Sequence, residues 1–531
     1  MGTKLTRHSL LCACLVAWAT PAFCLNPIQQ ENLQTGDSSW QLATAAGHRV
    51  ADDSNSQIKG YASATSVNKG STITFYVTVN PTPQAYTIYV YRMGWYGGTG
   101  GRLMQTIALT ASTPQPTCTT DAFTMTPGGT GLTQCAWSAS YTLNVPTTWT
   151  SGVFLARLVN ANNYENYMTF VVRDDDRTAD LLYEQPVTTY EAYNTYPVNT
   201  SLYLTRGDAG DPSGSGAPAV VKVSFDRPYS GDGAGNLIGL HELDFVQWAE
   251  KTGYDLAYAT SVDIATGPNL LRYKGVLSVG HDEYWSAAMR SRIEASRNLG
   301  VNLGFFGGND MVWQIRFENA NRVIVCYRDA STDPNPDPSL KTVEWRNLSP
   351  SRPEQTIVGV QYGRLITKPS STVGDGDQDY VPVNTNHWVY DGIDLGTHAY
   401  IPIVNVGYET DHFYAASDPV SPFPPPSNRS FVLLSSSPIL SSSVDPDVSA
   451  GLNPTTSLVQ NSVIYQANSA AWVFAAGTVN WNNYLCVLGA SCTASPVLQG
   501  MTKNILDRYA SALRAPGAAA VSGSALISSA N

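Results

Sequence analysis

The stretch from Tyr273 to Phe306 reads YKGVLSVGHDEYWSAAMRSRIEASRNLGVNLGFF, and it indicates most clearly which fold the chain adopts. A short apolar run, Tyr273 to Val279, is followed by a run with helical spacing, Ser286 to Asn298. A second apolar run, Gly300 to Phe306, comes next. Short strands that alternate with helices of this length are typical of βαβ units in a mostly parallel sheet. We therefore predict an α/β domain around this stretch.

The flanking segments extend the α/β pattern in both directions. Between about residues 320 and 438 the chain is rich in Pro and Asp with scattered strand-like runs, which predicts a large β-rich insertion. The remaining predicted elements are strands at Leu181 to Tyr183, Ala219 to Phe225 and Ala471 to Asn480, and helices at Leu237 to Lys251 and Leu498 to Leu513.

The residues before about 175 follow a different pattern. Ser71 to Val79 alternates around Ile73, Phe75 and Val77, and similar runs lie at Tyr86 to Met93 and Gly152 to Leu158. Short alternating runs separated by Pro, Gly and Thr clusters predict a β-sandwich. The predicted organisation is thus a β-sandwich over 25–175, an α/β domain over 176–513 with its insertion at about 320–438, and a disordered tail over 514–531.

The first 24 residues have the features of a secretory signal. Lys4 and Arg7 precede an apolar run from Leu10 to Ala19, and Ala22-Phe23-Cys24 places small residues before a cleavage at Leu25. The apolar run is shorter than the ~20 residues that a membrane-spanning helix needs. No other stretch has the pattern of a membrane span. We therefore expect a secreted or periplasmic protein.

Export favours disulfide formation by the cysteines outside the signal. Cys118 and Cys135 flank a Thr- and Gly-rich loop, and Cys486 and Cys492 close a tight one, so we predict one disulfide within each pair. Cys326 is then left over beside the apolar run Val323 to Val325. We expect it to be a buried, inert thiol rather than a nucleophile.

The composition excludes several classes of protein. The formal net charge is −11 and the pI is about 5.1, which disfavours binding to nucleic acid through charge. Gly and Pro are present at ordinary levels, so collagen-like and disordered classes are excluded for most of the chain. The Gly-x-Ser-x-Gly motif of many serine hydrolases does not occur.

Polar and phenolic side chains follow the predicted strands of the α/β domain. Ligands of open α/β sheets bind outside the carboxyl ends of the strands, so these side chains are candidates for one shared site. Each has an ordinary alternative, since a carboxylate or imidazole can cap the next helix and a tyrosine can be a half-buried core residue. The candidates are Tyr190 and Tyr193, then Tyr229, then His281 and Glu283, then Asn309.

An ordered set of motifs resembles the large (β) subunit of N,N-dimethylformamidase. The resemblance runs over most of residues 60 to 505, and Tyr91 to Gly98 is similar to the β-domain that precedes the α/β domain in many secreted relatives. The motifs that carry it are Ala192-Tyr193-Asn194, Phe225-Asp226-Arg227-Pro228-Tyr229, Gly280-His281-Asp282-Glu283-Tyr284-Trp285, Phe305-Phe306-Gly307-Gly308-Asn309-Asp310 and Gly407-Tyr408-Glu409.

The resemblance implies a mononuclear ferric ion, Fe(III), as cofactor, because that family holds one with two tyrosines and one glutamate. Carried over to this sequence, the metal ligands are Tyr193, Tyr229 and Glu283, with Tyr190 left open as an alternative to Tyr193. The same resemblance implies that His281, Asn309 and Glu409 support the ligands or act in catalysis.

This ligand set fits amide hydrolysis. Oxygen ligands suit hard cations, and phenols with a pKa near 10 need a strong Lewis acid to lose their protons at neutral pH. Such an ion polarises a carbonyl and activates water, with Glu409 as general base and an acid and an amine as products. The α/β pattern also resembles glutamine-amidotransferase-like domains. His281-Asp282-Glu283 stands where those domains need a Cys nucleophile, so thiol catalysis is not expected.

Two functions from different classes follow. The first is a secreted iron-dependent amidohydrolase that cleaves a C–N bond of a small amide. The second is a non-catalytic secreted protein whose β-sandwich binds carbohydrate or a surface, for which Trp95 and Tyr96 supply stacking aromatics. The expected partner is a small-molecule amide, with no nucleic acid. The dimethylformamide enzyme works with a small second subunit, which nothing in this chain supplies, and homo-oligomerisation is left open.

Overall fold

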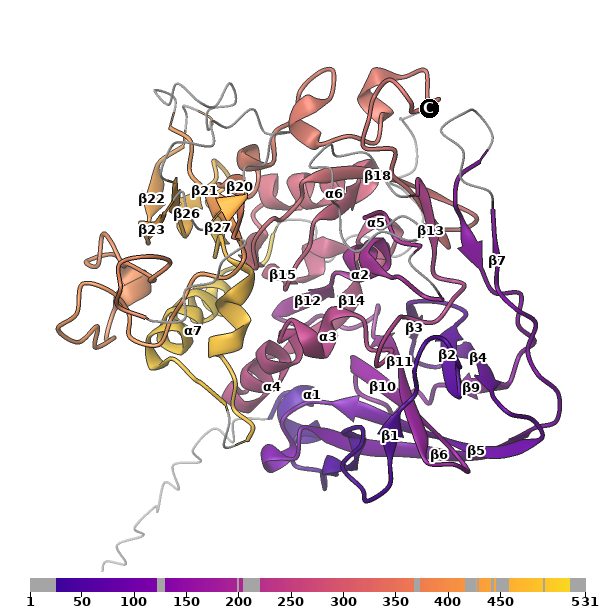
Figure 1. Ribbon diagram of the computed structural model, residues 1–531. Coiled ribbons are helices and arrows are strands. Elements are labelled where there is room, and N and C mark those ends of the chain that lie inside the picture. The colour runs from indigo at the N-terminus through magenta and orange to yellow at the C-terminus, as the bar shows by residue number, and fades with distance from the viewer. Residues whose placement is uncertain are drawn as a thin grey trace, which may run out of the picture.

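The computed structural model describes residues 25–121, 129–197, 200–203, 220–366, 373–415, 426, 429–440, 444–445, 458–489 and 492–515. The predicted signal segment, residues 1–24, and residues 516–531 of the predicted tail lie outside these residues. The chain forms several sheets and seven short to medium α-helices within the described ranges (Figure 1).

Two antiparallel-rich sheets form the N-terminal part of the chain, drawn in indigo and violet in Figure 1. The larger sheet contains β1 (Arg49–Val50), β11 (Tyr164–Arg173), β10 (Gly152–Asn160), β5 (Gln84–Met93) and β6 (Gly101–Ala111), with β3 (Ser66–Asn68) paired to β11. The smaller sheet contains β2 (Ile58–Ala62), β4 (Thr72–Val79) and β9 (Tyr141–Asn144). The strands predicted at 71–79, 86–93 and 152–158 are therefore confirmed.

The larger N-terminal sheet is covered on both faces, and β10 shows how. Phe154 and Ala156 belong to a core shared with the smaller sheet. Val153 and Leu155 alternate with them and belong to a second core, shared with the α/β part of the chain. Because neighbouring residues of a strand point to opposite faces, an almost continuous apolar run is needed here. The N-terminal sheets therefore pack directly against the α/β part.

The central sheet of the α/β part has seven strands in the order β14, β12, β15, β17, β27, β26, β22. The first five run parallel to their neighbours, and β26 and β22 continue the sheet antiparallel. Their bounds are β14 (Leu256–Thr260), β12 (Leu181–Gln185), β15 (Gly275–Val279), β17 (Asn302–Phe306), β27 (Trp472–Ala475), β26 (Val463–Gln466) and β22 (Phe431–Leu433). The parallel α/β pattern predicted from Tyr273 to Phe306 is confirmed.

One strand does not join this sheet as we predicted. The run from Ala219 to Phe225 gives the short strand β13 (Lys222–Ser224), which pairs antiparallel with β19 (Val323–Val325) in a four-stranded sheet with β18 (Trp313–Glu318) and β16 (Tyr284–Ser286). Helix α2 lies between β12 and β13, but β13 pairs antiparallel with β19 and does not return parallel to β12 in the central sheet. The loop after β13 therefore does not start at the edge of the parallel sheet.

Short strands complete the structure. The three-stranded sheet of β21 (Glu409–His412), β20 (Gln361–Ile366) and β24 (Val444–Asp445) lies within and just beyond the Pro- and Asp-rich region. Two-stranded pairs are formed by β23 (Ser437–Ile439) with β25 (Leu458–Gln460), and by β7 (Thr119–Thr120) with β8 (Thr133–Gln134). The domain boundaries given above stay a prediction.

The helices cover the faces and the ends of the sheets. A left-handed residue, His241 at φ 59°, separates α3 from α4, so the helix predicted over 237–251 is broken into two. The helices are α1 (Pro27–Glu31), α2 (Val187–Tyr193), α3 (Asn236–Gly239), α4 (Glu242–Thr252), α5 (Ser261–Thr266), α6 (Ala287–Asn298) and α7 (Pro496–Ser511).

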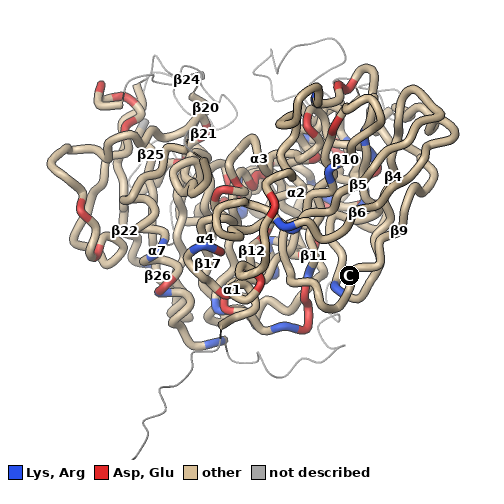
Figure 2. The backbone as a smooth tube through the Cα atoms, turned by 90° about the horizontal axis from the view of Figure 1, so that it is seen from below, with Lys and Arg blue, Asp and Glu red and all other residues tan. Residues whose placement is uncertain are grey.

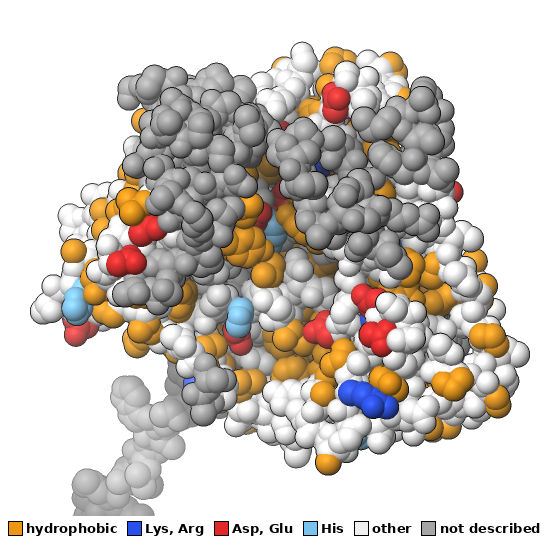
Figure 3. All heavy atoms as spheres, viewed as in Figure 1, with side chains coloured by type: hydrophobic (Ala, Val, Ile, Leu, Met, Phe, Trp, Pro, Cys, Tyr) orange, Lys and Arg blue, Asp and Glu red, His pale blue; other side chains and the backbone are white. Residues whose placement is uncertain are grey.

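The cysteines behave as predicted. Cys118 is bonded to Cys135, and Cys486 is bonded to Cys492. Cys326 is free and buried, and its burial raises the pKa of the thiol to about 12. Charged side chains are sparse along the backbone and on the face drawn in space-filling form (Figures 2 and 3). In the described part of the chain, every helix is too short or too polar to cross a membrane.

Candidate active site

Two loops at the carboxyl ends of neighbouring parallel strands form the floor of the site. Gly280-His281-Asp282-Glu283 follows β15, and Gly307-Gly308-Asn309 follows β17. Gly307 is required because a Cβ atom there would lie 1.9 Å from the carbonyl oxygen of Gly280. Gly280 itself has φ +97°, a conformation that favours glycine. The close approach of the two loops places the Asn309 amide nitrogen 3.3 Å from His281 Nε2, so the structure brings together two of the residues that follow neighbouring strands.

The Glu283 carboxylate lies at the centre of the site and is almost completely buried. Its Oε2 atom accepts a hydrogen bond of 2.9 Å from the Tyr193 hydroxyl. The Tyr203 hydroxyl lies 2.7 Å from Oε1 and 2.9 Å from Oε2, and the Trp313 indole N–H donates to Oε1 at 2.8 Å. The Glu283 backbone N–H donates to Thr189 Oγ1 at 2.9 Å, which fixes the residue against α2. Two phenols and one carboxylate therefore meet at one point.

The two tyrosines stack on each other beside Glu283. Tyr193 is the last residue of α2, and the chain returns so that the Leu202 N–H donates to the Ala192 carbonyl at 2.9 Å. This return places the Tyr203 ring 4.3 Å from the Tyr193 ring, centroid to centroid, at an interplanar angle of 19°. Desolvation holds the pKa of both phenols well above its ordinary value, and the Glu283 carboxylate adds to the shift. Both phenols are therefore neutral unless a cation displaces their protons.

A second carboxylate faces His281. The Nε2 atom of His281 lies 2.7 Å from Glu409 Oε2, with which it forms an ion pair, and 3.5 Å from Glu283 Oε2. Burial alone would lower the pKa of His281, but Glu409 and then Glu283 raise it to about 9. The imidazole is therefore cationic at neutral pH and compensates part of the carboxylate charge.

Strand β21 supplies contacts to both floor loops from the opposite side. Glu409 and Asp411 alternate along β21, so they share one face of the strand. Asp411 Oδ1 accepts the Asn309 backbone N–H at 2.9 Å, and the Asn309 amide nitrogen lies 3.3 Å from His281 Nε2. Asn309 Oδ1 is buried and has no hydrogen-bond partner in the described part of the structure. The side-chain oxygen of Asn309 is thus left as a hydrogen-bond acceptor near the carboxylates of Glu409 and Asp411.

Tyr190 and Tyr193, the two tyrosines of α2, have different hydrogen-bond partners. The Tyr190 hydroxyl donates to Glu242, and the Gln185 amide contacts the same hydroxyl at 3.3 Å. Of Tyr190 and Tyr193, Tyr193 is therefore the one that contacts Glu283.

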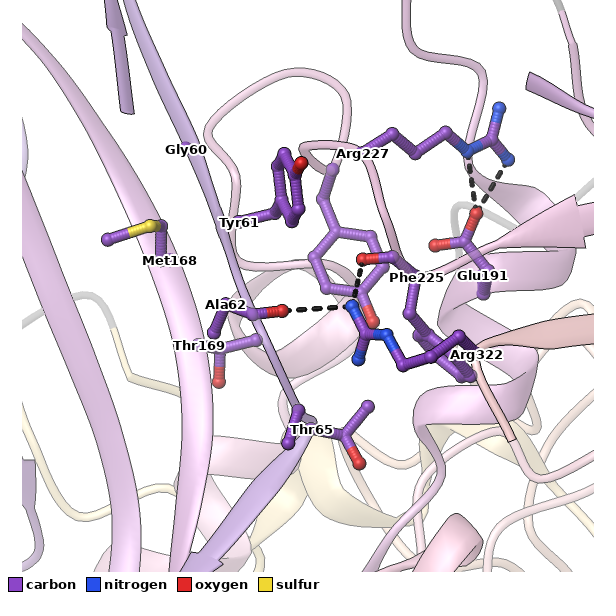
Figure 4. Close-up of a pocket in the computed structure, with 12 residues that line it drawn as sticks. Gly60, Tyr61, Ala62, Thr65, Met168, Thr169, Glu191, Phe225, Arg227 and Arg322 are labelled. Carbon is purple, nitrogen blue, oxygen red and sulfur yellow. Dashed lines mark hydrogen bonds and ion pairs between the residues drawn. The ribbon is translucent and has the colours of Figure 1, made fainter. Parts of the chain in front are cut away.

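Tyr229 packs against Tyr190. The edge of its ring packs on Tyr190, with centroids 6.0 Å apart at 73°. It lines a small cavity of about 30 Å³ between the N-terminal sheets and the α/β part, in which Arg227 points to Glu191 (Figure 4). Within the described ranges no hydrogen bond joins Tyr229 to Glu283. The assignment of Tyr229 as a ligand stays a prediction of the resemblance, and Tyr203 is the second tyrosine whose hydroxyl contacts Glu283.

The sequence reading missed Tyr203 and Trp313. Tyr203 does not follow a strand, and it reaches the site through the return of the chain after α2, which no local pattern indicates. Trp313 begins β18, shortly after Asn309, and its indole N–H donates to Glu283. The only feature of the sequence that could have indicated Trp313 was its position just after the loop Gly307-Gly308-Asn309.

The donor chemistry of the site fits a hard cation held by phenol oxygens. Among the described residues, no group of three or more His, Cys, Asp or Glu side chains is arranged to hold a metal ion. Tyr193, Tyr203 and Glu283 instead present oxygen atoms only, and both tyrosine hydroxyls lie within hydrogen-bond distance of the Glu283 carboxylate. Oxygen donors of this kind suit a hard, strongly acidic ion such as Fe(III).

Comparison with known proteins identifies one family. The family model described as "N,N-dimethylformamidase beta subunit-like, C-terminal" matches residues 87–494. No curated protein matches the chain. A solved structure of a cycloisomaltooligosaccharide glucanotransferase from Paenibacillus sp., complexed with cycloisomaltoheptaose, is 13% identical. The likeness covers 52% of this chain and 34% of that one at a TM-score of 0.15, so it supports no conclusion about fold or function.

Proposed function

Because this chain belongs to the N,N-dimethylformamidase β-subunit-like family, we propose that it is an iron-dependent hydrolase that cleaves the C–N bond of a small amide. The observation that carries the proposal is the convergence of Tyr193, Tyr203 and Trp313 on the buried Glu283, with the His281–Glu409 pair beside it. A structural role does not require two phenols and two carboxylates in one buried place, because burying uncompensated carboxylates is costly.

Tyr193, Tyr203 and Glu283 would hold the ion. Fe(III) would supply Lewis acidity, which polarises the amide carbonyl and makes water acidic enough to attack at neutral pH. The hydroxyl oxygens of both tyrosines lie within hydrogen-bond distance of the Glu283 carboxylate, so these oxygens would be available to hold a cation together with Glu283. The indole of Trp313 keeps Glu283 Oε1 fixed during the reaction.

The other side chains move protons and orient the substrate. Glu409 Oε2 accepts the proton that the attacking water loses, and the same proton passes to the leaving amine nitrogen as the C–N bond breaks. The His281 imidazolium, 2.7 Å from Glu409, holds this carboxylate in place. The Asn309 amide nitrogen donates to the oxygen that gains negative charge when water adds to the carbonyl carbon. The net reaction takes one amide and one water to one acid and one amine.

We propose in addition that the mature chain acts outside the cytoplasm. The two disulfides support this, because such bonds persist in oxidising compartments. The signal pattern of residues 1–24 supports it independently.

The test is a metal and activity assay on the purified mature chain. We expect about one iron per chain and release of amine from small amides. Glu283→Gln is expected to bind no iron and to release no amine, since it removes the charged ligand. Tyr164→Phe serves as a matched control, because Tyr164 is half-buried in β11 and has no contact with the site. An iron-free wild-type chain after reconstitution, or a Glu283→Gln variant with full iron content, would contradict the proposal.

A further inference from the structure

Arg328 is a cationic side chain packed on the aromatic wall of the site. Its guanidinium carbon lies 3.7 Å from the centroid of the Tyr203 ring and 4.8 Å from that of Trp313. The Tyr284 ring is also close, at 5.8 Å. Tyr203 and Trp313 are both donors to Glu283, so one guanidinium contacts two of the groups that fix this carboxylate.

A directed chain of hydrogen bonds connects Arg328 to Glu283. Arg328 Nη2 donates to the Tyr284 hydroxyl, and the Tyr284 hydroxyl donates to the Tyr203 oxygen. The Tyr203 hydroxyl in turn donates to Glu283. The chain has one consistent direction, so the Tyr203 oxygen still receives the Tyr284 hydrogen bond after a cation replaces its own proton. The Arg328 guanidinium is thus connected through hydroxyl groups to the candidate ligand Tyr203.

The backbone supports a specific role for this residue. Arg328 has φ +60°, which is uncommon for a residue with a side chain, and its N–H donates to the Thr342 carbonyl at 2.8 Å. Within the described part of the chain no Asp or Glu forms an ion pair with the guanidinium, and its Nε atom is buried without a partner. An uncommon conformation persists where the surroundings enforce it, which occurs most often at functional sites.

We propose that Arg328 is a positioning residue for the iron site: it clamps the Tyr203 ring and, through the Tyr284 hydroxyl, directs a hydrogen bond at the Tyr203 oxygen. This inference rests on the proposed function, because it concerns the geometry and electron density of a ligand. The guanidinium stacks on the ring by a cation–π contact that strengthens when the site is desolvated. The hydrogen bond withdraws electron density from the Tyr203 oxygen.

Removing the guanidinium has two measurable consequences. The Tyr203 oxygen becomes a stronger electron donor, so the phenolate-to-iron charge-transfer band moves to longer wavelength. The ring also loses its clamp, so iron binding weakens by about tenfold, the size expected for a desolvated cation–π contact. Neither effect follows from a general loss of stability.

The experiment compares visible spectra and iron affinities of Arg328→Met, Arg328→Lys and Tyr284→Phe with the wild-type chain. Arg49→Met is the control, since Arg49 lies 4.1 Å over Tyr164 in the N-terminal sheets and has no contact with the site. Arg328→Met is expected to show the longer wavelength and the weaker binding, and Arg328→Lys to recover part of both. Tyr284→Phe keeps the ring and removes only the connecting hydroxyl, so it is expected to shift the band with little loss of iron.

The outcomes separate this inference from the proposed function. A wild-type chain that shows the band, together with an unshifted band in Arg328→Met and Tyr284→Phe, overturns the role of Arg328 and leaves the iron site standing. If Arg328→Met does not fold, as judged by circular dichroism, an unshifted band in Tyr284→Phe overturns the role by itself. A wild-type chain that binds no iron overturns both.

Discussion

Replacing Arg92 by methionine tests whether the N-terminal sheets and the parallel sheet unfold as one unit. Arg92 in β5 and Glu250 in α4 form a fully buried pair, with Nη2–Oε1 at 2.7 Å and Nη1–Oε2 at 3.1 Å. Tyr258 donates to the same carboxylate at 2.7 Å. Removing one partner of such a pair leaves an uncompensated buried charge, which costs about 3–5 kcal/mol. We expect the free energy of unfolding in guanidinium chloride to fall by that amount.

The size of this loss is checked against two other variants. Arg92→Met/Glu250→Gln removes the stranded charge, so it is expected to recover about half of the loss or more. Arg49→Met removes an exposed cation–π contact in the same sheet and is expected to cost about 0.5–1 kcal/mol. A loss below about 1 kcal/mol in Arg92→Met, or two separate unfolding transitions in the wild-type chain, would refute the reasoning.

Three further predictions follow from the described contacts. Glu409→Gln is expected to lower kcat by about 10²- to 10⁴-fold while iron content stays at the wild-type level, because a general base is lost but no ligand is; a parallel loss of iron would contradict this. Cys326 is expected to resist alkylation by iodoacetamide at pH 8 in the folded chain and to react once denatured, since burial keeps the thiol protonated; rapid labelling of the folded chain would show otherwise. Gly307→Ala is expected to abolish activity and lower the melting temperature, because its Cβ meets the Gly280 carbonyl oxygen at 1.9 Å; an active variant would mean that the floor loops separate more easily than the structure shows.

Much of the fold was predictable because local patterns decide it. The run from Gly275 to Phe306 contains a buried strand, a capped helix and a second buried strand, and each has its own periodicity. The N-terminal strands were predictable for the same reason, since β4 alternates between buried and less buried positions. The partner of β13 was not predictable, because three residues carry no signal of direction.

The candidate site was predictable where its residues follow parallel strands. Strand ends meet at one edge of a sheet, so His281, Glu283 and Asn309 could be grouped from their positions alone, and the structure brings them together. Tyr203 and Arg328 reach the site through chain returns after α2 and β19. Those returns are fixed by contacts with Tyr193, Tyr284 and Thr342, which no strand or helix periodicity in the sequence predicts.

Tyr229 is assigned as a ligand by a sequence motif, whereas Tyr203 is assigned by its position in the structure. The Phe225-to-Tyr229 motif assigns Tyr229 by resemblance, and the structure seats that residue on Tyr190 near Glu191. Tyr203 has no motif of its own, but its hydroxyl contacts both oxygens of Glu283. Metal ligands are selected by distance and donor type, so geometry is the stronger guide here.

The most direct test of the iron site is the visible spectrum of Tyr203→Phe beside that of Tyr229→Phe, both after reconstitution with ferric iron. Each change removes one phenol oxygen and keeps the ring, so the pair isolates which oxygen binds the ion. We predict that Tyr203→Phe loses a large part of the phenolate-to-iron band, while Tyr229→Phe keeps the wild-type band and one iron per chain. A full band in Tyr203→Phe with a lost band in Tyr229→Phe would contradict the ligand set of Tyr193, Tyr203 and Glu283.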